Sequence, residues 1–147
     1  MIFKQIKDLE LAKADEIIKI ESEEYPGGGV DIWILKSIFH YGKIFVIEED
    51  NKIASIAEFM SSFNTGEAYL YGICTKSTYQ GKGYGKFLIE NSHKELKNIG
   101  IKKIFLTVAP SNINAIKLYE NLGYNREQFI KDEYGKGIDR YLMSIDI

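Results

Sequence analysis

The sequence predicts a single mixed α/β domain over residues 1–147, built on a central sheet whose first half is antiparallel and which later contains a parallel strand pair. Apolar residues make up 45% of the chain, enough for one packed core. Turn signals separate consecutive strand-like runs early in the chain, which indicates hairpins. A strand–helix–strand unit follows, and such a unit joins parallel strands.

The first quarter of the chain is expected to form a short strand and two helices. Residues 2–6 are typical of a strand, and residues 8–22 carry apolar side chains at helical spacing. The segment Pro26-Gly27-Gly28-Gly29 breaks the chain. Asp31 can then cap a second helix that runs to about Phe39.

Three strands and two turns come next. The strand-like runs span residues 43–49, 52–62 and 67–75. Asp50-Asn51 and Asn64-Thr65-Gly66 provide the turn residues between them. Three strands joined by such short turns pair with one another in antiparallel fashion.

The second half alternates helices and strands. A helix over residues 84–98 ends at Gly100, and a later helix over residues 112–121 ends at Gly123. The strands of this half are expected at 102–108, 124–130 and 138–146. The whole chain should therefore contain about seven strands and about four helices.

Composition narrows the classes of function. The formal net charge is −2, and no run of like charge suggests a nucleic-acid groove or a membrane-surface patch. Cys74 is the single cysteine, and no Cys/His spacing suits a metal. We see neither a signal-peptide pattern nor the ~18–20 apolar residues of a membrane span, so we expect a cytoplasmic protein without nucleic-acid or membrane partners.

The turn Gln80-Gly81-Lys82-Gly83-Tyr84-Gly85-Lys86 joins a strand to a helix and resembles an anion site. Its glycines remove side chains where a ligand would approach the backbone. The first amides of the helix lack internal partners and lie at the positive end of its dipole. Lys82 and Lys86 add positive charge. Pyrophosphate is the natural ligand, and a connector without a ligand is the alternative.

Two other phosphate motifs do not fit this turn. The dinucleotide fingerprint G-x-G-x-x-G, started at Gly81, would need a glycine at Lys86. The P-loop would need a glycine at Gln80 and a serine or threonine at Phe87.

Two segments together resemble the GNAT superfamily of N-acetyltransferases. Gln80-x-x-Gly83-x-Gly85 is similar to the acetyl-CoA signature Q/R-x-x-G-x-G/A. Asn112 to Tyr124 is similar to the family's helix pattern N-x-x-A-x-x-L-Y-x-x-x-G-F/Y. The order of the expected elements also matches the family along the whole chain. A departure is that Thr75 and Ser77 stand where the family often has valine and proline.

The resemblance implies a GNAT fold that holds acetyl-CoA, the co-substrate, where the fourth and fifth strands splay apart. Backbone groups of Ile73 and Thr75 would pair with the pantetheine arm, which Asn112 would also contact. The turn amides would bind the pyrophosphate. The implied cofactor-binding residues are Ile73, Thr75, Gln80, Gly81, Lys82, Gly83, Tyr84, Gly85, Lys86, Asn112 and Tyr119.

The implied reaction is direct attack of a primary amine on the thioester in a ternary complex. The resemblance places Tyr119 beside the thioester sulfur, where its phenol can protonate the leaving thiolate. On helical spacing alone, Tyr119 could instead pack with Ala115 in an apolar stripe. The resemblance also assigns the backbone N–H of Ile73 to the developing oxyanion.

The sequence does not identify the general base. Family members that acetylate ribosomal proteins have a glutamate where Thr107 stands, and histone-type members have one where Tyr69 stands. Glu67, Glu58, Tyr69 and Tyr71 remain candidates, with Glu67 taken as the catalytic choice, although it could be an exposed residue at a hairpin end. The missing glutamates keep a non-catalytic acyl-CoA sensor as the alternative function.

The acceptor is expected to be an amine of a small molecule, a protein or a peptide. Glu21, Glu23 and Glu24 lie beside the glycine loop, where acidic groups would attract a cationic amine, although a solvated helix end is the alternative. The loop over residues 131–136 should border the same pocket. Dimers are common in the family, so a homodimer is possible.

Overall fold

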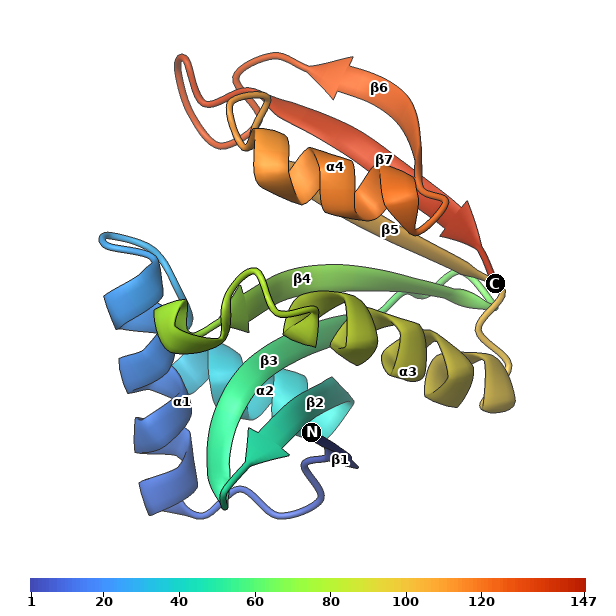
Figure 1. Ribbon diagram of the computed structural model, residues 1–147. Helices are drawn as coiled ribbons and strands as arrows, with labels where there is room; N and C mark the ends of the chain where they lie inside the picture. Colours follow the sequence, from blue (N-terminus) through green and yellow to red (C-terminus); the bar gives the residue numbers. More distant parts are fainter.

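The computed structural model covers residues 1–147 and contains seven strands, four α-helices and one short 3-10 turn (Figure 1). The strands are β1 (Ile2–Gln5), β2 (Gly42–Glu49), β3 (Lys52–Ser61), β4 (Glu67–Thr75), β5 (Lys103–Val108), β6 (Asn125–Ile130) and β7 (Arg140–Asp146). The helices are α1 (Leu11–Glu24), α2 (Ile32–Tyr41), α3 (Tyr84–Asn98) and α4 (Ile113–Asn121), and the 3-10 turn spans Ser77–Tyr79.

All seven strands belong to one sheet in the order β1-β2-β3-β4-β5-β7-β6. The pairs from β1 to β4 are antiparallel, and β4 pairs with β5 in parallel. These observations confirm the predicted fold class. The predicted boundaries differ from the observed ones by a few residues; α1, for example, begins at Leu11 rather than at residue 8.

Local chemistry explains where the helices begin. The Asp31 carboxylate accepts a hydrogen bond from the Ile34 amide at 2.8 Å at the start of α2. The Asn112 side-chain oxygen accepts one from the Ala115 amide at 3.2 Å at the start of α4. Helix α3 instead begins after Gly83, which has φ 85° and provides no side-chain cap. The first amides of α3 are therefore left open.

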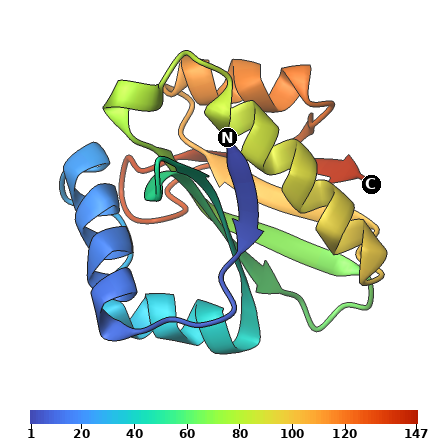
Figure 2. The same ribbon diagram turned by 60° about the horizontal axis from the view of Figure 1, so that its bottom comes forward.

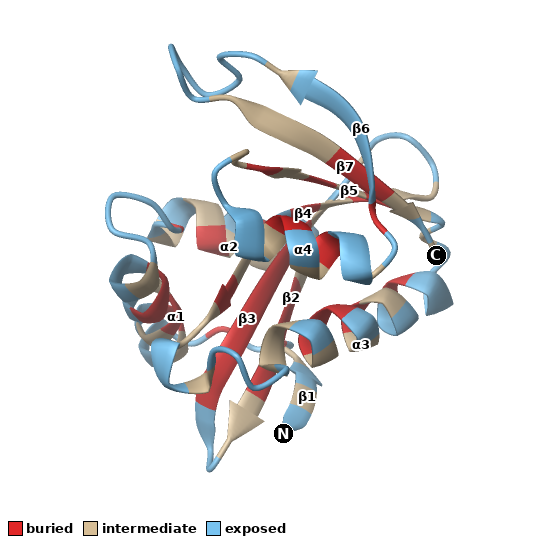
Figure 3. Ribbon diagram, turned by 45° about the horizontal axis from the view of Figure 1, so that its top comes forward, coloured by how far each residue is buried: buried red, intermediate tan, exposed pale blue.

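Two buried clusters hold helices against the two faces of the sheet (Figure 2). Helices α1 and α2 contribute to the cluster on one face, and α3 and α4 contribute to the cluster on the other. Strands β2 and β3 lie between them and are largely buried, whereas β6 forms an exposed edge (Figure 3). None of the four helices has both the length and the apolar character required to cross a bilayer.

The parallel pair β4–β5 is joined at one end only. Its register runs from Glu67 opposite Lys103 to Tyr69 opposite Phe105, so only the first three residues of each strand pair. The carbonyl of Gly66 accepts hydrogen bonds from the amides of Lys102 and Lys103 and closes this end. Beyond Tyr69 the strands diverge (Figure 1), which is the splay that the family resemblance implied.

Candidate active site

A cavity of about 680 Å³ lies between the diverging ends of β4 and β5. Its wall is formed by the end of α1 with the glycine loop 27–29, by residues 69–73 of β4 and by residues 107–109 at the end of β5. Helix α4 and two residues near β7, Tyr134 and Arg140, complete it. The splayed strand pair therefore creates a site to which segments far apart in the sequence contribute.

The glycine turn beside this cavity presents a row of unpaired backbone donors. Gly81 and Gly83 have φ values of 71° and 85°, and a Cβ atom at either position would meet nothing within 4 Å. None of the six amides from 81 to 86 donates a hydrogen bond within the protein. The first engaged amide is that of Phe87, which donates to the Gly83 carbonyl at 3.0 Å. The turn can therefore offer these amides to an anion.

The approach to the turn is held by α1. The side-chain amide of Gln80 donates to the Thr75 carbonyl at 2.8 Å and to the Glu24 carboxylate at 3.1 Å. The other oxygen of Glu24 accepts from the Ser77 amide at 2.7 Å. Glu24 therefore anchors the segment that leads to the turn, and Gln80 supports the turn through its side chain.

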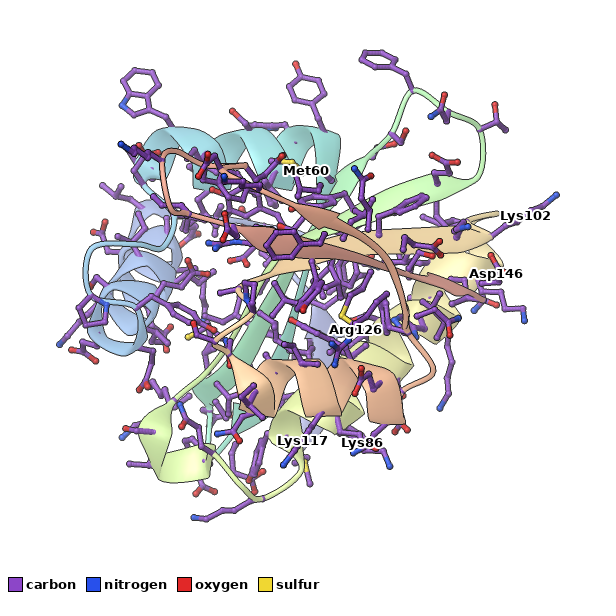
Figure 4. All side chains as sticks on the ribbon, turned by 90° about the horizontal axis from the view of Figure 1, so that it is seen from above. Met60, Lys86, Lys102, Lys117, Arg126 and Asp146 are labelled. Atoms are coloured by element: carbon purple, nitrogen blue, oxygen red, sulfur yellow. The ribbon has the colours of Figure 1, made fainter.

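The remaining polar side chains of the turn do not converge on its amides. Lys82 donates to the Thr78 carbonyl at 2.8 Å, and the Tyr84 hydroxyl donates to Glu49 at 3.1 Å. Lys86 projects from α3 away from the sheet (Figure 4). The structure thus leaves the anion-binding capacity of this segment to its backbone.

The edge of β4 that faces the gap belongs to Ile73 and Thr75. The Lys76 amide donates to the Ala54 carbonyl of β3, so by antiparallel alternation Ile73 and Thr75 direct their backbone groups away from β3. The Ile73 carbonyl already accepts a hydrogen bond from the Tyr25 hydroxyl at 2.5 Å, as the Thr75 carbonyl does from Gln80. Their N–H groups are the ones left for a ligand in this conformation.

Tyr119 lines the cavity from α4, and only 6% of its surface is exposed. Its ring packs 5.6 Å from that of Tyr124, and its hydroxyl makes no hydrogen bond within the protein. Burial raises the pKa of Tyr119 well above its ordinary value, so the phenol keeps its proton at neutral pH. Asn112 also lines the cavity, at the start of the same helix.

A ring of three hydroxyl groups closes the cavity on the β5 side. The Tyr69 hydroxyl lies 3.0 Å from that of Thr107 and 3.3 Å from that of Tyr134, and the last two are also 3.3 Å apart. Burial raises the pKa of Tyr69 to about 12, which makes it a poor base at neutral pH. Tyr134 comes from the loop between β6 and β7, which the sequence analysis expected to border the pocket.

Glu67 is not brought to the cavity. It lies at the closed end of the strand pair, opposite Lys103, and its carboxylate accepts a hydrogen bond from the Asn64 side chain at 3.1 Å. The choice of Glu67 as the catalytic base is therefore corrected, because β4 places it at the end where the strands meet and not where they part.

Two other carboxyl groups lie at the opposite side of the cavity. Glu21 lines the cavity from α1, and its carboxylate accepts a hydrogen bond from the Val30 amide at 2.8 Å. Glu58 of β3 is fully buried, and neither of its oxygens has a hydrogen-bond partner. Burial, and then the neighbouring Glu21, raise the pKa of Glu58 well above its ordinary value.

Comparison with known proteins agrees with this geometry. Residues 10–124 match the family model described as Acetyltransferase (GNAT) family. The chain belongs to this family. The acetyltransferase is 28% identical to an N-alpha-acetyltransferase of Saccharolobus solfataricus, over 95% of this chain and 90% of that protein. It is also 33% identical to the ribosomal protein bS18-alanine N-acetyltransferase of Escherichia coli, in a match that covers 61% of this chain and 60% of that enzyme.

Solved structures resemble the acetyltransferase along its whole length. The crystal structure of the Escherichia coli ribosomal-protein-S18-alanine N-acetyltransferase has a TM-score of 0.82 at 26% identity and covers 99% of this chain and 94% of that one. An aminoglycoside 6'-N-acetyltransferase complexed with coenzyme A has a TM-score of 0.87 at 12% identity, covering 99% and 97%, a likeness in fold. The chain is thus an N-acetyltransferase of the GNAT family, as the sequence predicted.

Proposed function

We propose that this enzyme transfers the acetyl group of acetyl-CoA to the N-terminal α-amine of a protein or peptide, by direct attack in a ternary complex. The observation that carries the proposal is the row of six unpaired amides at 81–86, beside a cavity that holds the free hydroxyl of Tyr119. The α-amine is favoured because the N-alpha-acetyltransferase and the bS18-alanine N-acetyltransferase are both similar to this chain.

The residues present fit acetyl-CoA along its length. The turn amides have the number and the placement at a helix start that a pyrophosphate needs. The N–H groups of Ile73 and Thr75 suit the pantetheine arm, as an added strand would pair with an edge. Asn112 uses its oxygen as a helix cap, so its side-chain N–H groups remain available to the same arm.

Acetyl-CoA supplies the acetyl thioester, and this chain supplies the groups that assist its transfer. The Ile73 N–H donates to the carbonyl oxygen as negative charge develops there. The Tyr119 hydroxyl gives its proton to the departing sulfur, and its raised pKa ensures that the proton is present when it is needed. Both groups lie on the wall of one cavity, so they can act on the same thioester.

A thermal-shift and turnover assay tests the function. Acetyl-CoA should raise Tm, by the amount that follows from its concentration relative to Kd. Release of the CoA thiol should follow addition of hexapeptides that begin with Ala, Ser or Met, and should vanish when their α-amines are blocked. Turnover of an aminoglycoside but no peptide would contradict the α-amine. Binding of acetyl-CoA without turnover of any amine would instead support a sensor.

A further inference from the structure

Glu21 is the single carboxylate on the wall of the cavity. The cavity has no histidine, and its other ionisable residues are five tyrosines and Arg140. Burial raises the pKa values of Tyr25, Tyr69, Tyr71 and Tyr119, so these phenols stay protonated near neutral pH. Glu21 is therefore the one side chain there that can take a proton from an amine at such a pH.

The fold holds Glu21 in one position at the cavity wall. It is 4% exposed, and its carboxylate accepts the hydrogen bond from Val30 just after the glycine loop. Gly29 has φ 88°, and a Cβ there would lie 3.1 Å from the Cβ of Glu21. A residue with a side chain at Gly29 would push Glu21 away, so the glycine allows the loop to close over it.

Glu58 lies directly behind the cavity wall, and its carboxyl group has no hydrogen-bond partner in the protein. It is 0% exposed and stands opposite Gly72, which lines the cavity. A Cβ on Gly72 would be 3.0 Å from the Oε2 atom of Glu58, so the carboxyl group reaches the cavity wall only because residue 72 lacks a side chain. An unpartnered, fully buried carboxyl group at this place calls for a function.

Glu21 is the carboxyl group next to Glu58. Burial and the charge of Glu21 keep Glu58 protonated, because its pKa is raised well above the ordinary value. A protonated carboxyl group can donate a hydrogen bond, and the Glu21 carboxylate is the neighbour that can accept it.

We propose that Glu21 accepts the proton of the acceptor amine and that Glu58 positions the Glu21 carboxylate for this step. The proposal rests on the proposed function and names the base that the function lacks. Glu21 is the catalytic residue, because it faces the cavity. Glu58 is a positioning residue, because it acts through Glu21.

The acceptor enters as an ammonium ion and gives one proton to the Glu21 carboxylate, which leaves a nitrogen lone pair free to attack. The C–N bond forms and the C–S bond breaks, and the sulfur takes the proton of Tyr119. The nitrogen loses its second proton, which restores Tyr119. Glu21 later releases its proton to solvent, so one turnover yields one net proton.

The pH dependence of Glu21→Gln tests the step. The probe is the peptide with the highest turnover, whose α-amine has an ordinary pKa of ~8. Without a base the variant depends on amine that is already neutral, so its kcat/KM should fall about tenfold per pH unit below 8. The ratio of wild-type to variant kcat/KM should therefore rise about 100-fold from pH 8 to pH 6. A ratio that is constant over this range would overturn the proposal.

Other ionisable groups should not obscure this profile. Tyr25, Tyr71 and Cys74 lie near the two carboxyl groups, and Glu24 and Asp31 lie near those three side chains. Burial raises the pKa of Cys74 to about 12 and those of the two tyrosines well above their ordinary values, so these groups do not titrate between pH 6 and pH 8. Glu24 and Asp31 are equally present in both enzymes, so they do not change the ratio.

Matched variants separate a chemical role from a structural one. Glu23→Gln removes a charge from the same helix at an exposed site and should keep the wild-type profile. Glu21→Asp should be slower but keep the wild-type pH dependence, which covers the case in which Glu21→Gln does not fold. The Glu58→Gln side chain can still donate a hydrogen bond to Glu21. The Glu58→Leu side chain cannot, so the acid limb of the kcat/KM profile should move to higher pH. If the acid limbs of the two kcat/KM profiles lie at the same pH, Glu58 does not position Glu21.

The controls also distinguish the two levels of proposal. If the wild-type enzyme acetylates a peptide but Glu21→Gln shows a constant ratio, only the role of Glu21 fails. If the wild-type enzyme binds acetyl-CoA and acetylates no amine, the proposed function fails and the role of Glu21 fails with it.

Discussion

Tyr119 has the two properties that a proton donor to a departing thiolate requires. Its phenol is protonated at neutral pH, because burial raises its pKa, and its hydroxyl opens on the cavity without a partner in the protein. Tyr119→Phe removes the hydroxyl and keeps the ring, so we expect kcat to fall by about 100-fold while acetyl-CoA still raises Tm. Steady-state kinetics with the best peptide, together with thermal shifts, would measure both effects.

The neighbouring Tyr124 provides the control for this variant. Its hydroxyl contacts the His93 ring nitrogen at 2.9 Å, and it does not line the cavity. Tyr124→Phe should cost about 1 kcal/mol of stability through the lost hydrogen bond and leave kcat near the wild-type value. An equal fall in kcat for both variants would show that Tyr119 acts through packing.

At the scale of the element, the start of α3 differs from its end in one respect. Gly83 and Gly100 both have positive φ values, 85° and 94°, and both have open space around them. Valine at either position should cost about 1–3 kcal/mol in backbone strain. Only Gly83→Val should also abolish the acetyl-CoA thermal shift, because its side chain would stand among the turn amides. A retained shift for Gly83→Val would contradict the anion site.

The elements themselves were predictable because their signals are local. Apolar spacing and turn residues indicated all seven strands and four helices, and the motif of the turn lies within seven consecutive residues. The 3-10 turn at Ser77–Tyr79 was not predicted, since three residues are too few to show a period.

The contacts between elements could not be predicted in the same way. Tyr25 meets the carbonyl of Ile73 across 48 residues of sequence, and Tyr69 meets Tyr134 across 65. Glu67 had a suitable side chain on a suitable strand, but spacing does not tell at which end two strands part. Gly72 was the available signal for the buried carboxyl pair, because a glycine inside a strand often marks a close approach.

At the scale of the whole molecule, Glu58 should lower stability as pH rises. Its folded-state pKa is raised, so above the unfolded pKa of ~4.3 the folded protein binds more protons than the unfolded chain. Stability therefore falls with rising pH up to the folded pKa. Glu58→Gln removes this pH-dependent contribution to the free energy of unfolding. The Tm of the variant minus that of the wild type should therefore increase from pH 5 to pH 8, by about 2–4 °C for each kcal/mol that the wild type loses.

Thermal denaturation of both proteins at the two pH values measures this difference. Glu23→Gln, at an exposed position, should show a Tm difference from the wild type that does not change with pH. An advantage of Glu58→Gln that shrinks toward pH 8 would mean that Glu58 ionises readily in the folded protein.

The last turn of α1 has contacts on three sides. Glu21 faces the cavity, Glu24 holds the segment that leads to the glycine turn, and Tyr25 bonds to the edge of β4. A shift of this helix end would displace all three contacts together. Under the proposed function, this helix end would align the nucleophile and the thioester from a common reference point, and their relative placement should survive a change of sequence in the β6–β7 loop on the other side of the cavity.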